Sequence, residues 1–215
     1  MKIGIFPGIF NPPHVAHLIM VCDFYEKFNL DKVYIVPTKQ YETDKEIDVS
    51  PYDRFEMVNE MVKDYDFIEV SDFEIKSESI NYTYKTIKYF KEIFNNKDDQ
   101  FYLLVGMDWF DGISKWKNFD YIYSNVIIVF YLRERDILNF NDATFDKYNL
   151  KNNFNKLNRN EIDKIEIKDG IFIIGRFLNI SSTEIREKIK NNKPFKQFLT
   201  KEVYNYIINK GLYLK

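Results

Sequence analysis

Short runs of hydrophobic residues recur along the chain, and most are followed by a stretch in which apolar residues have helical spacing. In the runs at 102–105 and 126–129 every residue is apolar, which is typical of strands covered on both faces of a parallel sheet. The pattern predicts strands at Lys2–Phe6, Lys32–Pro37, Phe67–Val70, Phe101–Val105, Val126–Tyr131 and Ile171–Ile174.

Capping residues mark where the helices between these strands begin. At 50–53 the sequence Ser-Pro-Tyr-Asp supplies an N-cap, a first-turn proline and a first-turn acid, which predicts a helix that ends near Val62. Ser181 and Glu184 form a capping box for another helix, and a last helix is expected over about 201–209. Right-handed crossovers then predict an α/β fold, a doubly wound, Rossmann-like, mostly parallel sheet with helices on both faces. In such a sheet the ligand cleft lies beyond the carboxyl ends of the strands.

Length and composition favour one domain. The chain has 215 residues, 45% of them hydrophobic, which is enough for one sizeable core spanning 1–215. The stretch 134–168 is rich in Asn, Asp and Lys with weak periodicity, and we interpret it as an insertion or long excursion. No apolar stretch approaches the roughly twenty residues that span a bilayer, so no membrane partner is expected.

Charge and cysteine content restrict the partners further. A formal net charge of -2 gives no overall basic field, so no nucleic-acid partner is expected and a polyanionic ligand should be small and locally held. The single cysteine, Cys22, excludes an internal disulfide and a multi-cysteine zinc site, and it fits the cytoplasm. The sequence allows an oligomer.

The residues that follow the first strand are the main candidates for chemistry. His14 and His17, the only histidines, stand where a helix with apolar spacing begins. At i and i+3 both rings lie on the face of the first turn, where free backbone amides and the helix dipole favour an anion. Their N–H groups can donate hydrogen bonds to phosphoryl oxygens. Two other interpretations stay open: core packing of both rings, and a zinc site with Cys22 as a third ligand.

The segment Gly8–His17 resembles the Gly-Thr-Phe-Asp-Pro-Pro-His-x-Gly-His element of the nucleotidyltransferase superfamily, in which paired histidines contact the phosphates of a nucleoside triphosphate. This chain has Ile9, Asn11 and Ala16 where the pattern has a small hydroxyl residue, an acid and a glycine. The resemblance implies that catalysis involves both histidines and that ATP is contacted by Gly8, Ile9, Phe10, His14 and His17.

A second segment, Ile180–Arg186, is similar to the Ile-Ser-Ser-Thr-x-Ile-Arg signature of the same superfamily. It is another helix start, with hydroxyls, free amides and an arginine one turn in, which suits pyrophosphate oxygens. Two anion-binding helix starts, one from each end of the chain, fit a triphosphate that is split between its α and β phosphates. The resemblance implies catalytic roles for Ser182 and Arg186, and ATP contacts from Ile180, Ser181, Ser182, Thr183 and Arg186.

A third segment, Gly106-Met107-Asp108 with Trp116 downstream, resembles the Gly-x-Asp segment of the family, in which Gly and Asp lie by the ATP ribose and the indole stacks on a pyridine ring. The implied ATP contacts are Gly106 and Asp108. An ordinary core aromatic is the alternative for Trp116.

Several landmarks resemble nicotinate-mononucleotide adenylyltransferases in particular. Residues 81–86 look like their Ser-Tyr-Thr-x-x-Thr element, and Arg54 falls in an Arg-x-x-x-Met segment with Met57 one place early. Arg133 follows a predicted strand where the family has a phosphate-facing arginine, and surface salt bridging is the alternative for both arginines. At 40–45, where the family has Pro-Pro-His-Lys, this chain has the lysine but lacks the histidine. The implied contacts to the pyridine nucleotide are Ile9, Phe10, Lys45, Thr83, Trp116 and Arg133.

The resemblance implies transfer of AMP from ATP to nicotinate mononucleotide, with Mg²⁺ held mainly by ATP phosphates rather than by a protein metal site. The products are the deamido-NAD dinucleotide and pyrophosphate. The alternatives are nicotinamide mononucleotide or phosphopantetheine as acceptor, and CTP as donor. Outside enzymes, the chain could be a nucleotide-binding regulator impaired by Ile9, Asn11 and Ala16, or a structural module that binds a protein partner.

Overall fold

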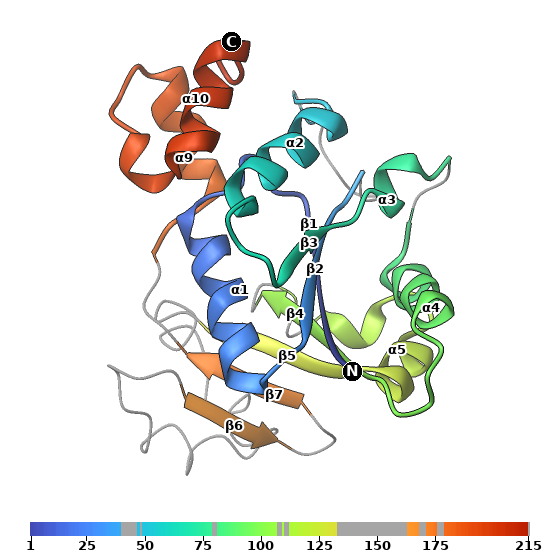
Figure 1. Cartoon of the computed structure of the whole chain (residues 1–215). Helices are drawn as coiled ribbons and strands as arrows, with labels where there is room; N and C mark the ends of the chain where they lie inside the picture. The colour runs from blue at the N-terminus through green and yellow to red at the C-terminus, as the bar shows by residue number, and fades with distance from the viewer. Residues whose placement is uncertain are drawn as a thin grey trace.

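A computed structural model of the chain describes residues 1–39, 47, 49–78, 81–106, 109, 112–132, 163–167, 171–175 and 179–214. Within these ranges one seven-stranded sheet has the order β3-β2-β1-β4-β5-β7-β6 (Figure 1). Its strands are β1 (Lys2–Gly8), β2 (Lys32–Pro37), β3 (Ile68–Val70), β4 (Gln100–Gly106), β5 (Ile127–Leu132), β6 (Asp163–Ile167) and β7 (Ile171–Gly175). Every neighbouring pair is parallel except β6 and β7, which confirms the predicted mostly parallel sheet.

The predicted strands are all present, with ends within two residues of those expected. Strand β6 was not predicted, and it lies inside the stretch 134–168 that we interpreted as an insertion. Its sequence Asp-Lys-Ile-Glu-Ile has no apolar run, because an edge strand paired on one side does not need the composition of a covered strand. Residues 134–162 lie outside the described residues, so the insertion stays a prediction.

The helices lie on both faces of the sheet (Figure 1). As predicted, the Ser50 hydroxyl caps α2 (Pro51–Val62) by accepting the Asp53 N–H at 3.0 Å, and the Ser181 hydroxyl caps α9 (Ser182–Lys190) by accepting the Glu184 N–H at 3.2 Å. The last helix ends at Gly211, whose φ of 63° is the left-handed conformation that favours glycine. The α-helices of the described residues are α1 (Val15–Phe28), α2 (Pro51–Val62), α3 (Phe73–Lys76), α4 (Thr83–Ile93), α5 (Phe119–Asn125), α9 (Ser182–Lys190) and α10 (Lys201–Lys210).

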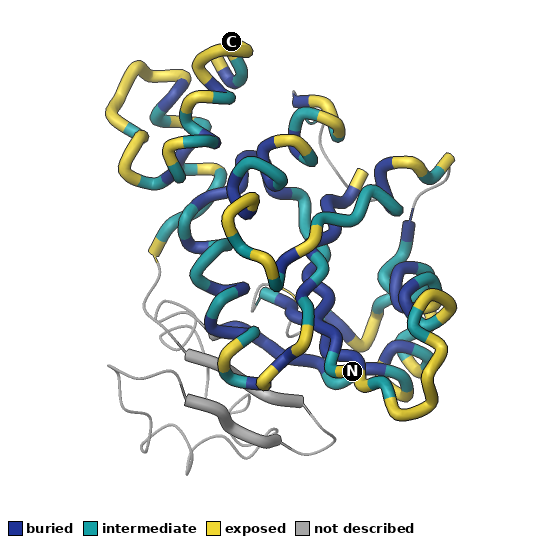
Figure 2. The backbone as a smooth tube through the Cα atoms, in the orientation of Figure 1, coloured by how far each residue is buried: buried dark blue, intermediate teal, exposed yellow. Residues whose placement is uncertain are grey.

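Two hydrophobic cores, one on each face of the sheet, explain the unbroken apolar runs. Tyr102 and Leu104 belong to the core under α1, α2, α9 and α10, whereas Leu103 and Val105 belong to the core under α4 and α5. Figure 2 shows the central strands as buried. Because successive side chains point to opposite faces, residues 101–105 of β4 enter the two cores alternately.

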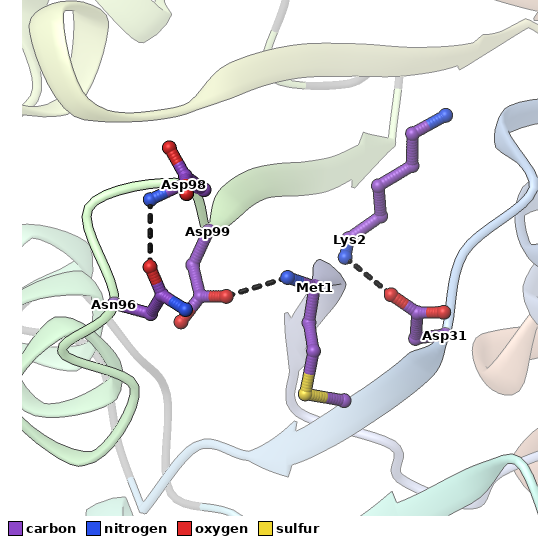
Figure 3. Close-up of polar contacts among 6 residues, drawn as sticks. All are labelled: Met1, Lys2, Asp31, Asn96, Asp98 and Asp99. Atoms are coloured by element: carbon purple, nitrogen blue, oxygen red, sulfur yellow. Dashed lines mark hydrogen bonds and ion pairs between the residues drawn. The ribbon is translucent and has the colours of Figure 1, made fainter.

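Polar contacts fix the amino end of the central strand β1 (Figure 3). The amino group of Met1 donates to Asp99 Oδ1 at 2.5 Å, and the Lys2 N–H donates to Asp31 Oδ2 at 2.7 Å. These contacts lie at the end of the sheet opposite to the carboxyl ends of β1, β2 and β4, where a doubly wound sheet binds its ligands. In the described ranges no helix is long and apolar enough to cross a membrane.

Candidate active site

The loop between β1 and α1 has an unusual backbone. Phe10 has a φ of 50°, in the left-handed region that non-glycine residues rarely adopt. Its buried ring packs edge-on against Phe6 at 5.3 Å and His17 at 5.0 Å between ring centroids. Gly8 lies under this ring, and a Cβ there would come within 2.9 Å of it, so any larger residue at this position would displace the ring. Such strain is typical of ligand-binding sites.

The two histidines form a stacked pair at the start of α1. Their ring centroids are 3.7 Å apart with an interplanar angle of 20°. The backbone N–H of His14 donates to His17 Nδ1 at 3.2 Å. Because Nδ1 accepts, a neutral His17 carries its proton on Nε2, which can donate to a ligand. His14 is buried and His17 is half-buried. Packing therefore accounts for His14 better than for His17.

The zinc interpretation finds no support. Among the residues that the structure describes, which include both histidines and Cys22, no group of three or more His, Cys, Asp or Glu could hold a metal ion. Cys22 is free and half-buried, and burial raises the pKa of its thiol.

The start of α9 lies against this loop, so the two predicted anion-binding helix starts come together. Ser182 Oγ donates to the Pro12 carbonyl at 2.8 Å, and Arg186 Nη1 donates to the Asn11 carbonyl at 2.6 Å. Arg186 Nη2 donates to Thr183 Oγ1 at 3.3 Å. The phosphate contacts expected of Ile180, Ser181, Ser182, Thr183 and Arg186 stay predictions.

Arg54 corrects one expectation. The alternative of a surface salt bridge is wrong for this residue, because its side chain is 0% exposed. Its guanidinium donates to the carbonyls of Ile9 at 2.5 Å, Thr38 at 2.7 Å and Lys39 at 2.9 Å. These carbonyls belong to the segments that follow the carboxyl ends of β1 and β2. Beyond the strands no neighbouring strand donates hydrogen bonds to them, and the Arg54 guanidinium donates instead.

The C-terminal tail also reaches the loop, which sequence reasoning missed. Tyr213 Oη donates to Asn11 Oδ1 at 2.7 Å across 202 residues of sequence. Both residues are 9% exposed. Burial raises the pKa of the Tyr213 phenol, and the positive charges of Arg186 and Arg54 lower it.

On the side expected for the pyridine nucleotide, two predicted segments are neighbours. Thr83 is the first residue of α4, and Lys117 Nζ from the segment of Trp116 lies 4.3 Å from the centroid of the Tyr82 ring. Trp116 is half-buried, packs against the core under α4 and α5, and meets Trp109 edge-on at 5.5 Å. Core packing thus accounts for one side of the indole.

Glu74 is a buried acid that no motif indicated. The Thr86 hydroxyl donates to Glu74 Oε1 at 2.5 Å, and Asn81 Nδ2 donates to the Glu74 carbonyl at 3.4 Å. Burial raises the pKa of Glu74 to about 7, and the hydrogen bond from the Thr86 hydroxyl acts in the opposite direction. This carboxyl therefore ties α3, which contains Glu74, to the first turns of α4.

Of the four remaining residues expected to bind substrates, the structure describes only Gly106. Gly106 ends β4 next to Tyr131 of β5, and a Cβ added there would meet nothing within 4 Å in the described part of the chain. Asp108, Lys45 and Arg133 lie outside the described residues, so their contacts stay predictions.

A doubly wound sheet whose first strand leads into a paired-histidine helix start, faced by a second helix start from the far end of the chain, defines a nucleotidyltransferase. Consistent with this class, the model of the cytidylyltransferase-like family matches residues 5–188.

Full-length relatives narrow the class. A probable nicotinate-nucleotide adenylyltransferase of Clostridium tetani is 32% identical, covering 99% of this chain and 98% of the relative. One from Caldicellulosiruptor saccharolyticus is 34% identical and covers 99% of both. The chain belongs to the nicotinate-nucleotide adenylyltransferase family.

A solved structure shares the fold. Plasmodium falciparum nicotinic acid mononucleotide adenylyltransferase, complexed with NaAD, superposes with a TM-score of 0.71 over 99% of this chain and 97% of its own, at 19% identity.

Proposed function

We propose that this chain transfers AMP from ATP to nicotinate mononucleotide, giving nicotinate adenine dinucleotide and pyrophosphate. The observation that supports this most directly is the contact between the loop 8–14 and the start of α9, made through Ser182 and Arg186. It gathers two helix starts and two histidines at the carboxyl end of β1, where a triphosphate can be gripped on both sides of the bond that breaks.

The acceptor needs little activation. A phosphate monoester is mostly a dianion at neutral pH, because its second pKa is near 6. One of its oxygens attacks the α-phosphorus in line, a new P–O bond forms, and the bond to the bridging oxygen of the β-phosphate breaks with its electron pair leaving on pyrophosphate. The protein supplies alignment and charge compensation. His17 donates from Nε2 to a phosphoryl oxygen. The backbone N–H of His14 fixes that tautomer, because it donates to His17 Nδ1.

The hydrogen bonds at α9 refine the expected roles there. Ser182 Oγ already donates its only proton to the Pro12 carbonyl, so in this geometry its contact to a phosphate comes from the backbone N–H. A guanidinium has five donors, and the bonds of Arg186 to Asn11 and Thr183 do not exhaust them. Arg186 therefore serves the β and γ phosphates while it holds the loop.

Mg²⁺ enters with the triphosphate. Its ligands would be mostly phosphate oxygens and water, as is usual for Mg²⁺ that binds with substrate phosphates. Bound in this way it neutralises charge on the phosphates.

Acceptor choice is the direct test. Pyrophosphate release would be measured with ATP and Mg²⁺ in parallel wells holding nicotinate mononucleotide, nicotinamide mononucleotide or phosphopantetheine. We expect release with nicotinate mononucleotide above the other two. Release with phosphopantetheine alone would indicate a phosphopantetheine adenylyltransferase instead. If ATP binds but no well releases pyrophosphate, the result would favour the alternative of a nucleotide-binding regulator without catalysis.

A further inference from the structure

The C-terminal tail reaches the phosphate-binding loop through a strained backbone. After α10 ends, Gly211 and Tyr213 have φ values of 63° and 65°. Tyrosine in the left-handed region costs roughly 1–2 kcal/mol and persists only where other contacts hold it. Two contacts hold it: its ring packs in the hydrophobic core under α1, α2, α9 and α10, and its buried hydroxyl donates to Asn11 Oδ1 at 2.7 Å.

Asn11 lies in the middle of a loop whose backbone is held from several elements. Arg54 of α2 holds the Ile9 carbonyl, and Arg186 and Ser182 of α9 hold the Asn11 and Pro12 carbonyls. Whereas these three residues bind backbone carbonyls of the loop, the tail binds a side chain of the loop, that of Asn11.

The direction of these bonds determines what the loop can offer a ligand. In a trans peptide the C=O and N–H point in opposite directions, so the bond from Arg54 to the Ile9 carbonyl turns the Phe10 N–H away from Arg54. Pro12 and Pro13 have no N–H, so the loop has few amides to present. A small rotation of the loop would therefore misplace both the Phe10 amide and the histidine pair that follows.

We propose that Tyr213 is a positioning residue for ATP, which fastens the loop 8–14 through Asn11 in the shape that a triphosphate requires. This inference rests on the proposed function for the identity of the nucleotide. The loop positions the histidine pair and lies against the start of α9, and both are expected to bind the phosphates of ATP. Ile9 and Phe10 are also expected to contact the pyridine nucleotide, but Thr83 and Trp116 lie on other segments, so the effect should fall mainly on ATP.

The test is Tyr213→Phe, which keeps the ring and removes the hydroxyl. We expect the Kd for ATP, measured by calorimetry with Mg²⁺ on the full chain without acceptor, and the KM for ATP to rise roughly five- to tenfold, the usual scale of one buried hydrogen bond. The KM for nicotinate mononucleotide should stay within about twofold, which a general loss of structure would not produce.

Tyr206→Phe is the matched control. Its hydroxyl donates to Asp53 Oδ1 at 2.9 Å and ties α10 to α2 instead of to the loop. This variant should lose some thermal stability and bind ATP as the wild type does. Equal ATP affinities in Tyr213→Phe and the wild type, or equal losses in the two tyrosine variants, would overturn the proposal.

Asn11→Ala completes a double-mutant cycle. If the tail acts through Asn11, the double variant Asn11→Ala with Tyr213→Phe binds ATP no more weakly than Asn11→Ala alone, whereas multiplied effects would contradict the proposal. Should Tyr213→Phe fail to fold, Asn11→Ala compared with Tyr206→Phe gives the same answer. ATP binding without pyrophosphate release from any acceptor would count against the proposed function and leave this test intact.

Discussion

Replacing Glu74 with glutamine should change how the stability of the protein depends on pH. Glu74 is 2% exposed, and its pKa is raised by burial to about 7 from an ordinary value of 4.5. The folded state therefore binds a proton more readily than the unfolded state does. The resulting stability is fully present below about pH 4.5 and is lost as the pH rises through about 7.

The size of the effect follows from the two pKa values. Each pKa unit corresponds to roughly 1.4 kcal/mol, so the full loss is on the order of 3 kcal/mol, most of which falls between pH 5 and pH 8. Glutamine does not titrate, and its amide can still accept the hydrogen bond from Thr86 Oγ1. Relative to the wild type, Glu74→Gln should thus gain roughly 5–10 °C in Tm between pH 5 and pH 8, since about 1 kcal/mol shifts Tm by about 2–4 °C at this chain length.

Thermal unfolding at half-unit steps from pH 5 to pH 8, followed by circular dichroism, measures this difference. Glu92→Gln is the control, because Glu92 is exposed on α4, the helix that contains Thr86. Its Tm should follow the wild type at every pH. A constant difference in Tm between Glu74→Gln and the wild type across the range would refute the reasoning, since it would mean that the pKa of the folded Glu74 carboxyl is not raised above that of the unfolded chain into this range.

Three further variants test the site. His17→Ala should lower kcat by about a hundredfold or more with Tm nearly unchanged, because it removes a donor to the transferring phosphoryl group, and unchanged turnover would contradict that role. Arg54→Met should lower Tm by roughly 6–20 °C, because losing the donors to three carbonyls costs about 3–5 kcal/mol; a loss below about 2 °C would mean that water replaces the guanidinium. Trp116→Ala should raise the KM for nicotinate mononucleotide about tenfold and leave the Kd for ATP unchanged, because stacked aromatic contacts are worth about 1 kcal/mol or more; an equal loss for both substrates would indicate a packing role alone.

Local patterns predicted the framework well because its causes are local. Strand β4 has an unbroken apolar run since both of its faces are covered, and the caps of α2 and α9 depend on residues three positions apart. Strand β6 escaped prediction because an edge strand can be largely charged, and its composition resembles that of a loop.

The parts of the site that sequence did not predict depend on distant partners. The burial of Arg54 requires a carbonyl 45 residues away, and the position of Tyr213 depends on Asn11, 202 residues away. In the sequence Glu74 is indistinguishable from a surface acid, and only the folded structure shows that it is buried against Thr86. Single polar residues carry no periodic signal, so these contacts could be found only in the folded chain.

The meeting of the two chain ends at one loop has a consequence for biosynthesis. Strand β1 and its histidines are made first, but the groups that hold the loop come from residues 182–213. A growing polypeptide can form the pairing of β1 with β2 and β4 long before it can grip a triphosphate. Affinity for ATP should therefore appear only after residues 182–213 have left the ribosome, and polypeptides released before that point would fold in part without binding ATP.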